Sequence, residues 1–254
     1  MPIITSAEIN LYHEQGYLIL PDLLNHEQMG SARSRLRTYL QGQNVGRNDF
    51  EGYKTERVHG LLGKAEIFGD FVAHPQVLRL LDRVLERNYL LSSCSAVLRH
   101  PRETPQVWYY EDDYVRLERP RVSMSIGVFW ALDEFNEENC ALELIPNSHT
   151  WNDEETPWGN DRRRIIVNMP PGSALVANGL LLHRCGSNRS EQDCLLVTTN
   201  YCQPWMRQHE NLLLSIPLEM VRRYPRRIQE LIGYNQHSSI VGHVDGKHPK
   251  TLLE

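Results

Sequence analysis

The chain has 254 residues, of which 41% are hydrophobic and 23% charged, and its formal net charge is −5. This composition suits one globular domain over residues 1–254 and excludes a disordered or fibrous chain. The weak negative charge excludes the basic surface that nucleic acids and anionic membranes require, so we expect neither as a partner. No apolar run approaches the roughly 18 residues of a membrane span, and no secretory leader is recognisable, so we expect a cytoplasmic protein.

Most of the elements predicted in the first third of the chain are helices. Capping signals predict helices that begin after Thr5 and Asn25, and a third helix begins at Pro75. Between the first two helices, Tyr17–Leu20 is expected to form a strand that Pro21 ends. Residues 42–63 are rich in glycine, asparagine and charge, which predicts a long loop at the edge of a substrate mouth.

Short β runs follow. They are predicted at Tyr89–Arg99, Arg121–Leu132, Ala141–Ile145, Arg164–Met169, Ser173–Ala177 and Leu195–Tyr201, and helices return at residues 217–224 and 225–232. Helices followed by antiparallel strands predict a mainly β fold with flanking helices. The specific expectation is a double-stranded β-helix, the cupin-like jelly roll, buttressed by helices.

Ionisable side chains gather in a run that extends from Gln106 to Tyr114. If this run is a strand, Tyr109, Glu111 and Asp113 share one face, because side chains alternate at a period of two. Asp112 and Asp113, with arginines nearby in the sequence, are predicted to form surface or rim ion pairs.

A second stretch, Gly179–Ser190, is an apolar run that ends in His183 and continues as a polar turn. A lone histidine is commonly a buried structural residue, but its imidazole can also act as an acid or base near neutral pH. The two stretches together predict a site built from two parts of the chain.

These residues resemble the phytanoyl-CoA dioxygenase family of iron(II)/2-oxoglutarate oxygenases. The resemblance is carried by Gln106, Tyr109-x-Glu111-Asp112-Asp113-Tyr114, Trp130-Ala131-Leu132-Asp133, Glu138-Asn139, Pro146-x-Ser148-His149 and Gly179…His183…Asn188-x-Ser190. It implies a jelly roll, an iron site made by a His-x-Asp pair and a distal histidine, and an arginine for the 2-oxoglutarate carboxylate.

The chain departs from the family motif at three of these four positions. Tyr109 stands at the first histidine, Glu111 at the aspartate and Cys194 at the arginine, and only His183 matches. A neutral phenol is a poor ligand for ferrous iron, and a thiol cannot form the two-pronged contact of a guanidinium with a carboxylate. We therefore expect no metal and no cofactor, with iron(II) and 2-oxoglutarate as the alternative.

The expected catalytic residues are His183 as acid or base, Glu111 as its orienting carboxylate and Tyr109 as a hydrogen-bond donor to developing negative charge. Tyr109 can equally be a packing residue, and Glu111 a solvated one. The expected substrate-binding residues are Gln106, Tyr114, Trp130, Asn188 and Cys194.

The leading functional hypothesis is an enzyme that isomerises, cyclises or dehydrates a small apolar metabolite in natural-product biosynthesis, without iron or 2-oxoglutarate. The second is an oxygenase with an atypical metal site formed by His183, Glu111 and water or Tyr109. The third is a non-catalytic scaffold subunit of an active paralogue. A small-molecule substrate and a homo-oligomer, or a hetero-oligomer with such a paralogue, are the expected partners.

Overall fold

The computed structural model describes residues 4–43, 45–139, 141–155 and 163–254. The α-helices are α1 (Ser6–Gln15), α2 (His26–Leu36), α3 (Phe68–Val72), α4 (Pro75–Val84), α5 (Leu212–Ser215), α6 (Leu218–Arg223) and α7 (Arg226–Ile232). The strands are β1 (Tyr17–Leu20), β2 (Thr55–Val58), β3 (Leu90–Arg99), β4 (Ser125–Ala131), β5 (Leu142–Leu144), β6 (Ile165–Ile166), β7 (Ala174–Asn178), β8 (His183–Cys185) and β9 (Cys194–Cys202).

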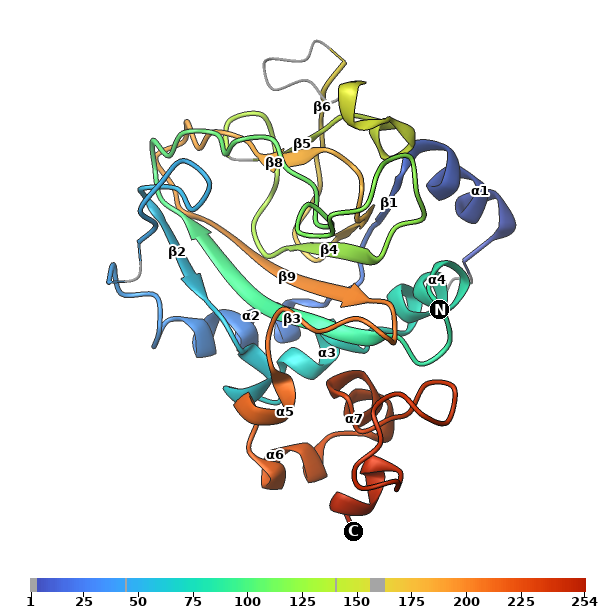
Figure 1. Cartoon of the computed structure of the whole chain (residues 1–254). Coiled ribbons are helices and arrows are strands. Elements are labelled where there is room, and N and C mark those ends of the chain that lie inside the picture. Colours follow the sequence, from blue (N-terminus) through green and yellow to red (C-terminus); the bar gives the residue numbers. More distant parts are fainter. Residues whose placement is uncertain (1–3, 44, 140, 156–162) are drawn as a thin grey trace.

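Two antiparallel sheets face each other and form the predicted jelly roll (Figure 1). The larger sheet runs in the order β1-β7-β4-β9-β3-β2, and the smaller one in the order β6-β5-β8. In Figure 1, α2, α3 and the C-terminal helices lie on the side of the larger sheet that faces away from the smaller sheet. The predicted fold class, a double-stranded β-helix buttressed by helices, is confirmed.

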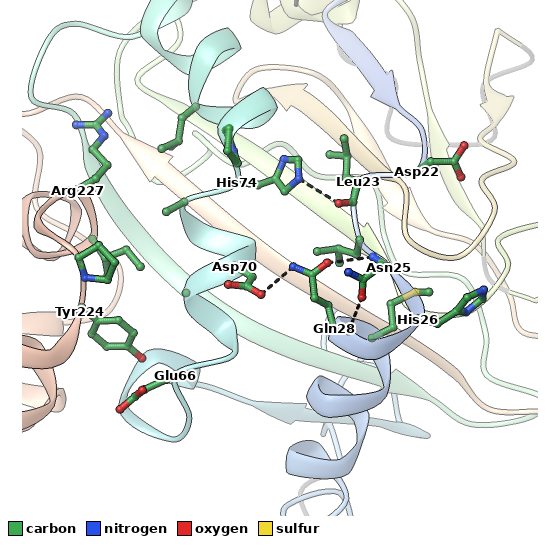
Figure 2. Close-up of a pocket in the computed structure, with 18 of the residues that line it drawn as sticks. Asp22, Leu23, Asn25, His26, Gln28, Glu66, Asp70, His74, Tyr224 and Arg227 are labelled. Atoms are coloured by element: carbon green, nitrogen blue, oxygen red, sulfur yellow. Dashed lines mark hydrogen bonds between the residues drawn. The ribbon is translucent and has the colours of Figure 1, made fainter. Parts of the chain in front are cut away.

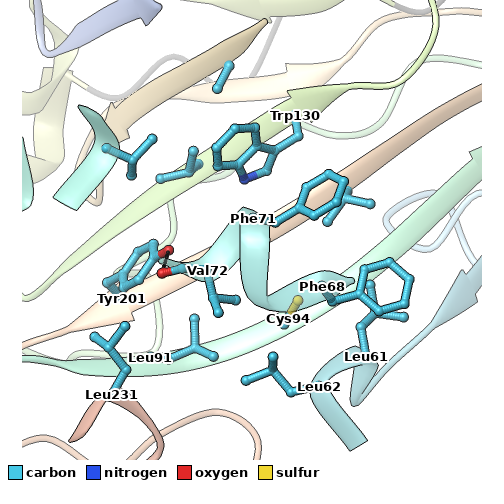
Figure 3. Packing of buried hydrophobic residues seen from close by; sticks show 14 of the residues in the cluster. Leu61, Leu62, Phe68, Phe71, Val72, Leu91, Cys94, Trp130, Tyr201 and Leu231 are labelled. Atoms are coloured by element: carbon cyan, nitrogen blue, oxygen red, sulfur yellow. Dashed lines mark hydrogen bonds between the residues drawn. The ribbon is translucent and has the colours of Figure 1, made fainter. Parts of the chain in front are cut away.

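The larger sheet separates two hydrophobic clusters. One fills the space between the two sheets and includes Phe129, Leu142 and Leu196. The other, shown in Figure 3, joins the opposite face of the sheet to the helices, and the indole of Trp130 lies there against the Phe71 ring at 5.4 Å between centroids. Consecutive residues of one strand, such as Phe129 and Trp130, therefore belong to different hydrophobic clusters, because side chains alternate across a strand.

The N-terminal capping predictions are confirmed in detail. Thr5 and Glu8 form a capping box at the start of α1, and Asn25 does the same with Gln28 at the start of α2. Gly16 ends α1 with a φ of 85°, the left-handed conformation in which a Cβ is disfavoured. This turn leads directly into β1 at the edge of the larger sheet.

Two predicted elements are wrong. Residues 42–63 contain a strand, β2, which pairs with β3 along the sheet edge. The run from Gln106 to Tyr114 is not a strand: Tyr109 makes an isolated bridge to His183, and the chain then turns at residues 111–114. The buried carboxylate of Asp112 explains the turn, because it accepts a backbone hydrogen bond from Met124 at 2.6 Å and anchors the chain there.

Helices long and apolar enough to cross a membrane are absent from the described ranges. The four described cysteines, Cys94, Cys185, Cys194 and Cys202, are buried, while Cys140 lies outside these ranges.

Candidate functional site

A cavity of about 680 Å³ opens next to the face of the larger sheet that is turned toward the smaller sheet. Its wall is built from alternate residues of three strands, among them Ser95 and Val97 of β3, Phe129 of β4 and Thr198 of β9. The chain that precedes and follows the Tyr109 bridge closes the opposite side. The volume lies within the range of pockets that bind small molecules.

His183 is fully buried and lies behind the lining of this cavity, in contact with the lining residues Tyr109 and Phe129. Its backbone exchanges two hydrogen bonds with Tyr109, of 2.9 and 3.1 Å, which places the Tyr109 ring over the imidazole at 4.4 Å. Phe129 contacts the same imidazole, with ring centroids 5.1 Å apart. The imidazole thus packs against two aromatic rings.

The hydrogen bonds of His183 define which ring nitrogen is free. Nδ1 lies 2.9 Å from the carbonyl oxygen of Leu181, and a carbonyl can only accept, so Nδ1 carries the proton. In the neutral ring the lone pair is then on Nε2, which is buried and has no hydrogen-bond partner among the described residues. This nitrogen is available to a ligand.

The Glu111 carboxylate faces that nitrogen. Its Oε1 lies 3.5 Å from His183 Nε2, and its Oε2 accepts a hydrogen bond from Asn200 Nδ2 at 3.1 Å. The Asn200 Oδ1 is a second buried acceptor without a partner in the described part of the chain. We call Tyr109, Glu111, His183 and Asn200 the cavity corner. Acceptor atoms that face each other in a buried space call for a cation or a donor between them.

Tyr109 brings a neutral phenol to the same corner. Burial raises its pKa well above the ordinary value, and the negative charge of Glu111 raises it further. The hydroxyl therefore stays protonated at neutral pH and is a hydrogen-bond donor rather than an anionic ligand.

The predicted substrate-binding residues are scattered. Gln106 lines the cavity, but its amide is bound to the Phe50 carbonyl and the Cys185 N–H. Tyr114 stands at the rim, with its ring 4.6 Å from that of His209. Trp130 lies on the helix side of the sheet, away from the cavity, because β4 directs it there.

Asn188 and Cys194 lie outside the lining of the cavity. The Asn188 amide donates to the carbonyls of Arg99 and Gln192 and so shapes the turn after β8. Cys194 begins β9 and is fully buried opposite Arg99 of β3.

The two aspartates next to Glu111 differ from each other. Asp112, predicted at the surface, is fully buried and forms an ion pair with Arg121 at 3.0 Å. Asp113 lies at the exposed rim of the cavity, where partial burial of its carboxyl raises the pKa of that group above the ordinary value. The prediction of a surface ion pair is therefore wrong for Asp112.

Sequence reasoning did not single out Asn200, Arg57 or Arg99. Asn200 follows Thr198 on the cavity face of β9, and Arg99 ends β3 as a fully buried cation. Both strands carry other polar residues, serines in β3 and threonines in β9, so polarity alone did not mark either position.

A larger cavity, of about 1100 Å³, lies on the helix side of the molecule (Figure 2). Its polar groups already bind one another: His74 Nε2 contacts the Leu23 carbonyl at 3.0 Å, and Gln28 donates to Asp70 at 2.8 Å. We place the functional site in the smaller cavity because the unpartnered acceptors converge there.

The jelly-roll fold is the one found in solved enzymes that contain a metal ion and 2-oxoglutarate. The model of the phytanoyl-CoA dioxygenase family matches residues 12–193, and the chain belongs to this family.

Individual relatives agree with this assignment. The Penicillium patulum protein named dioxygenase peniF is 24% identical over 268 residues, which cover 95% of this chain and 85% of the relative. The epimerase SnoN, solved with Fe3+, α-ketoglutarate and nogalamycin RO, matches with a TM-score of 0.64 and 15% identity over 80% of this chain and 86% of its own. HygX of Streptomyces hygroscopicus, solved with nickel, 2-oxoglutarate and hygromycin B, matches with a TM-score of 0.65 and 14% identity. The match covers 80% of this chain and 89% of HygX.

The expectation that the protein uses no cofactor is contradicted by these findings. The family is one of dioxygenases, and the two solved neighbours contain a metal ion together with 2-oxoglutarate. The error came from treating the loss of motif letters as a loss of function.

The described residues fit a metal ion in part. His183 Nε2 and the Glu111 carboxylate are of the donor types that ferrous iron prefers, and they face each other. Groups of three histidine, cysteine, aspartate or glutamate side chains able to hold a metal are absent from the described ranges. Two side chains of these donor types face each other, and Tyr109 stands where the family motif has its first histidine.

Proposed function

We propose that this protein is a tailoring oxygenase that binds a divalent iron ion and 2-oxoglutarate and acts on a small metabolite of natural-product biosynthesis. The proposal is supported by the family, by fungal relatives named dioxygenases, and by structural neighbours solved with nogalamycin RO and hygromycin B. Hydroxylation, epimerisation and ring closure all begin with attack on one substrate C–H bond and are the reaction types that we assign.

One observation carries the proposal. The lone pair of His183 Nε2 and the Glu111 carboxylate are both acceptors, they lie 3.5 Å apart, and Nε2 has no hydrogen-bond partner in the described structure. An orphaned buried acceptor is rare unless a ligand completes it. A divalent cation between the two groups would satisfy both.

In this reading, His183 and Glu111 hold the metal, and the chain orients both ligands. The Leu181 carbonyl fixes the imidazole through Nδ1, and Asn200 fixes the carboxylate. Such outer partners keep a ligand in the correct tautomer and rotamer. With iron and 2-oxoglutarate bound, the site would gain the oxidising power to break a C–H bond.

Tyr109 has a different task. Its protonated phenol lies beside the Glu111–His183 pair, where it can donate a hydrogen bond to a bound ligand oxygen. The Phe50 ring packs on Tyr109 edge to face at 5.0 Å, and the Phe129 ring also packs against the imidazole. These rings exclude water and give the substrate an apolar wall.

The test is an anaerobic calorimetric titration with Fe2+. We expect one ion per chain in the wild type. Glu111→Gln and His183→Gln should each weaken binding by more than the roughly 10–100-fold that loss of an outer partner costs. Asp113→Asn is the matched control, because Asp113 is a carboxylate of the same cavity that lies at its exposed rim.

Wild-type protein that binds no Fe2+ would overturn the proposal. Equal affinities of the wild type and Glu111→Gln would overturn the assigned ligands.

A further inference from the structure

Arg99 is a buried cation at the end of the cavity face. Ser93, Ser95 and Val97 of β3 line the cavity, and Arg99 follows on the same face of the strand. The side chain is fully buried. Its Nη2 donates to the carbonyl of Gly186 at 3.1 Å, and Gly186 directly follows Cys185, a lining residue. The guanidinium thus lies behind the cavity wall, close to the backbone that follows the lining residue Cys185.

The guanidinium is only partly satisfied. Nη2 also donates to the Thr104 carbonyl, but Nε and Nη1 are buried without a hydrogen-bond partner among the described residues. Glu103, a buried carboxylate nearby in the sequence, accepts instead from Thr55 Oγ1 and from the backbone of Lys54 and Thr104. A buried cation with unused donors is costly, and a carboxylate ligand is its natural complement.

A second arginine lies on the same wall. Arg57 of β2 pairs with Val97 and lines the cavity. Burial lowers its pKa, and the charge of Arg99 lowers it further, so the two cations lie within electrostatic range of each other. This end of the cavity is positive, whereas Glu111 makes the corner negative.

The strand register places Arg99 beside position 194, where the family motif has its arginine. Cys194 is directly paired with Arg99 across the β3–β9 ladder. Side chains of such paired residues lie on the same face, about 4.5–5.5 Å apart at Cβ. An arginine on either strand can therefore deliver its guanidinium to the same region.

The separation from the metal ligands suits a five-carbon dicarboxylate. His183 contacts Phe129, which pairs with Thr198, and Thr198 pairs with Ser95. Arg99 is four residues beyond Ser95, or roughly 13 Å along the strand. A 2-oxoglutarate spans about 5 Å between its end carbons, and an extended arginine reaches about 6 Å, from bond lengths of about 1.5 Å. A metal–oxygen contact and a hydrogen bond add about 5 Å to these two lengths, so an arginine that is not fully extended spans the separation.

From these contacts we infer that Arg99, assisted by Arg57, binds the distal carboxylate of 2-oxoglutarate, in the role that the family gives to an arginine at the position of Cys194. The inference rests on the proposed function, because it names the residues that hold the co-substrate of that site. The ligand is recognised by its second carboxylate, which a 2-oxo monocarboxylate lacks.

Calorimetry with two ligands tests this assignment. 2-Oxoglutarate and 2-oxopentanoate are titrated, with Mn2+ in place of Fe2+, into the wild type and Arg99→Gln. We expect Arg99→Gln to weaken 2-oxoglutarate binding about 100-fold, as loss of a charge-assisted contact does, and to leave 2-oxopentanoate within about threefold. A general disturbance of the cavity would weaken both ligands alike.

Two further variants keep the test decisive if Arg99→Gln folds poorly. The double variant Arg99→Gln/Cys194→Arg places a guanidinium on the neighbouring strand β9. It should restore the 2-oxoglutarate affinity to within about tenfold of the wild-type value. Arg57→Gln should weaken 2-oxoglutarate binding by a smaller factor. Thermal unfolding of each variant shows whether it is folded.

The outcomes separate the two claims. Wild type that binds no Mn2+ or Fe2+ overturns the proposed function, and titration of 2-oxoglutarate alone still reports on Arg99. Wild type that binds both metal and 2-oxoglutarate, with the same affinity for 2-oxoglutarate in Arg99→Gln, overturns only the inference about Arg99.

Discussion

Glu111 and Asp112 are consecutive carboxylates that the fold treats in opposite ways. Asp112 accepts from Arg121, Ser123, Ser125 and the backbone of Met124, and it has no exposed surface. We call these five residues the aspartate cluster. Among the described residues Glu111 has a single hydrogen bond, from Asn200, and its second oxygen faces a histidine nitrogen that has no hydrogen-bond partner there. One carboxylate holds the turn in place, and the other remains available to a ligand.

The difference between the two regions separates stability from function. A fully satisfied polar network rigidifies a fold, whereas groups left unsatisfied in the protein alone are typical of binding sites. The aspartate cluster also explains Gly179: a Cβ there would lie 2.5 Å from the Ser125 hydroxyl and 2.7 Å from the Asp112 carboxylate. The tight packing of the cluster places Glu111 at the cavity.

The largest expected effect is on stability. Asp112→Asn removes the charge that compensates the buried Arg121 and should cost about 3–5 kcal/mol of unfolding free energy. The isosteric change Glu111→Gln should stay within about 1 kcal/mol, because its amide can donate to the orphaned His183 Nε2. Urea denaturation of both variants measures this difference. Equal losses of stability would show that the comparison is wrong.

A smaller effect is expected on the titration of Tyr109. Its folded-state pKa is raised first by burial and then by Glu111, so its contribution to stability is fully present below pH about 10. That contribution is lost as the pH rises through the folded-state pKa. Tyr109→Phe should therefore flatten the alkaline fall in stability, and Glu111→Gln should lower the pKa of Tyr109 without returning it to the ordinary value.

Difference absorbance in the alkaline range, with Tyr109→Phe as the reference, follows this single phenol. Asp112 is not among the groups that raise the pKa of Tyr109. A shift caused by Asp112→Asn in a folded variant, and none caused by Glu111→Gln, would reverse the roles assigned to the two carboxylates.

Local signals in the sequence sufficed for most of the fold. The capping signals at Thr5 and Asn25 and the alternation that marks β4 depend on neighbouring residues, so the sequence alone shows them. The strand β2 was missed because Thr55–Val58 is short and lies among turn residues. Its pairing with β3 stabilises it, and pairing across the chain has no local signature.

The site was only partly predictable for the same reason. His183 and Glu111 were identified from their positions in a motif, and the structure places them 3.5 Å apart. Trp130 was assigned to the cavity although the phase of β4 directs its indole to the helices. Arg99 and Cys194 lie 95 positions apart in sequence and meet only through the strand register, so a linear motif records the cysteine and not the arginine opposite it.

The most direct test of the account is a crystal structure of the protein grown without air and soaked with Mn2+ and 2-oxoglutarate. We predict an anomalous peak between His183 Nε2 and the Glu111 carboxylate. The claim that these two residues form the metal site would be contradicted if no anomalous peak appeared at this corner, or if the peak lay on other side chains.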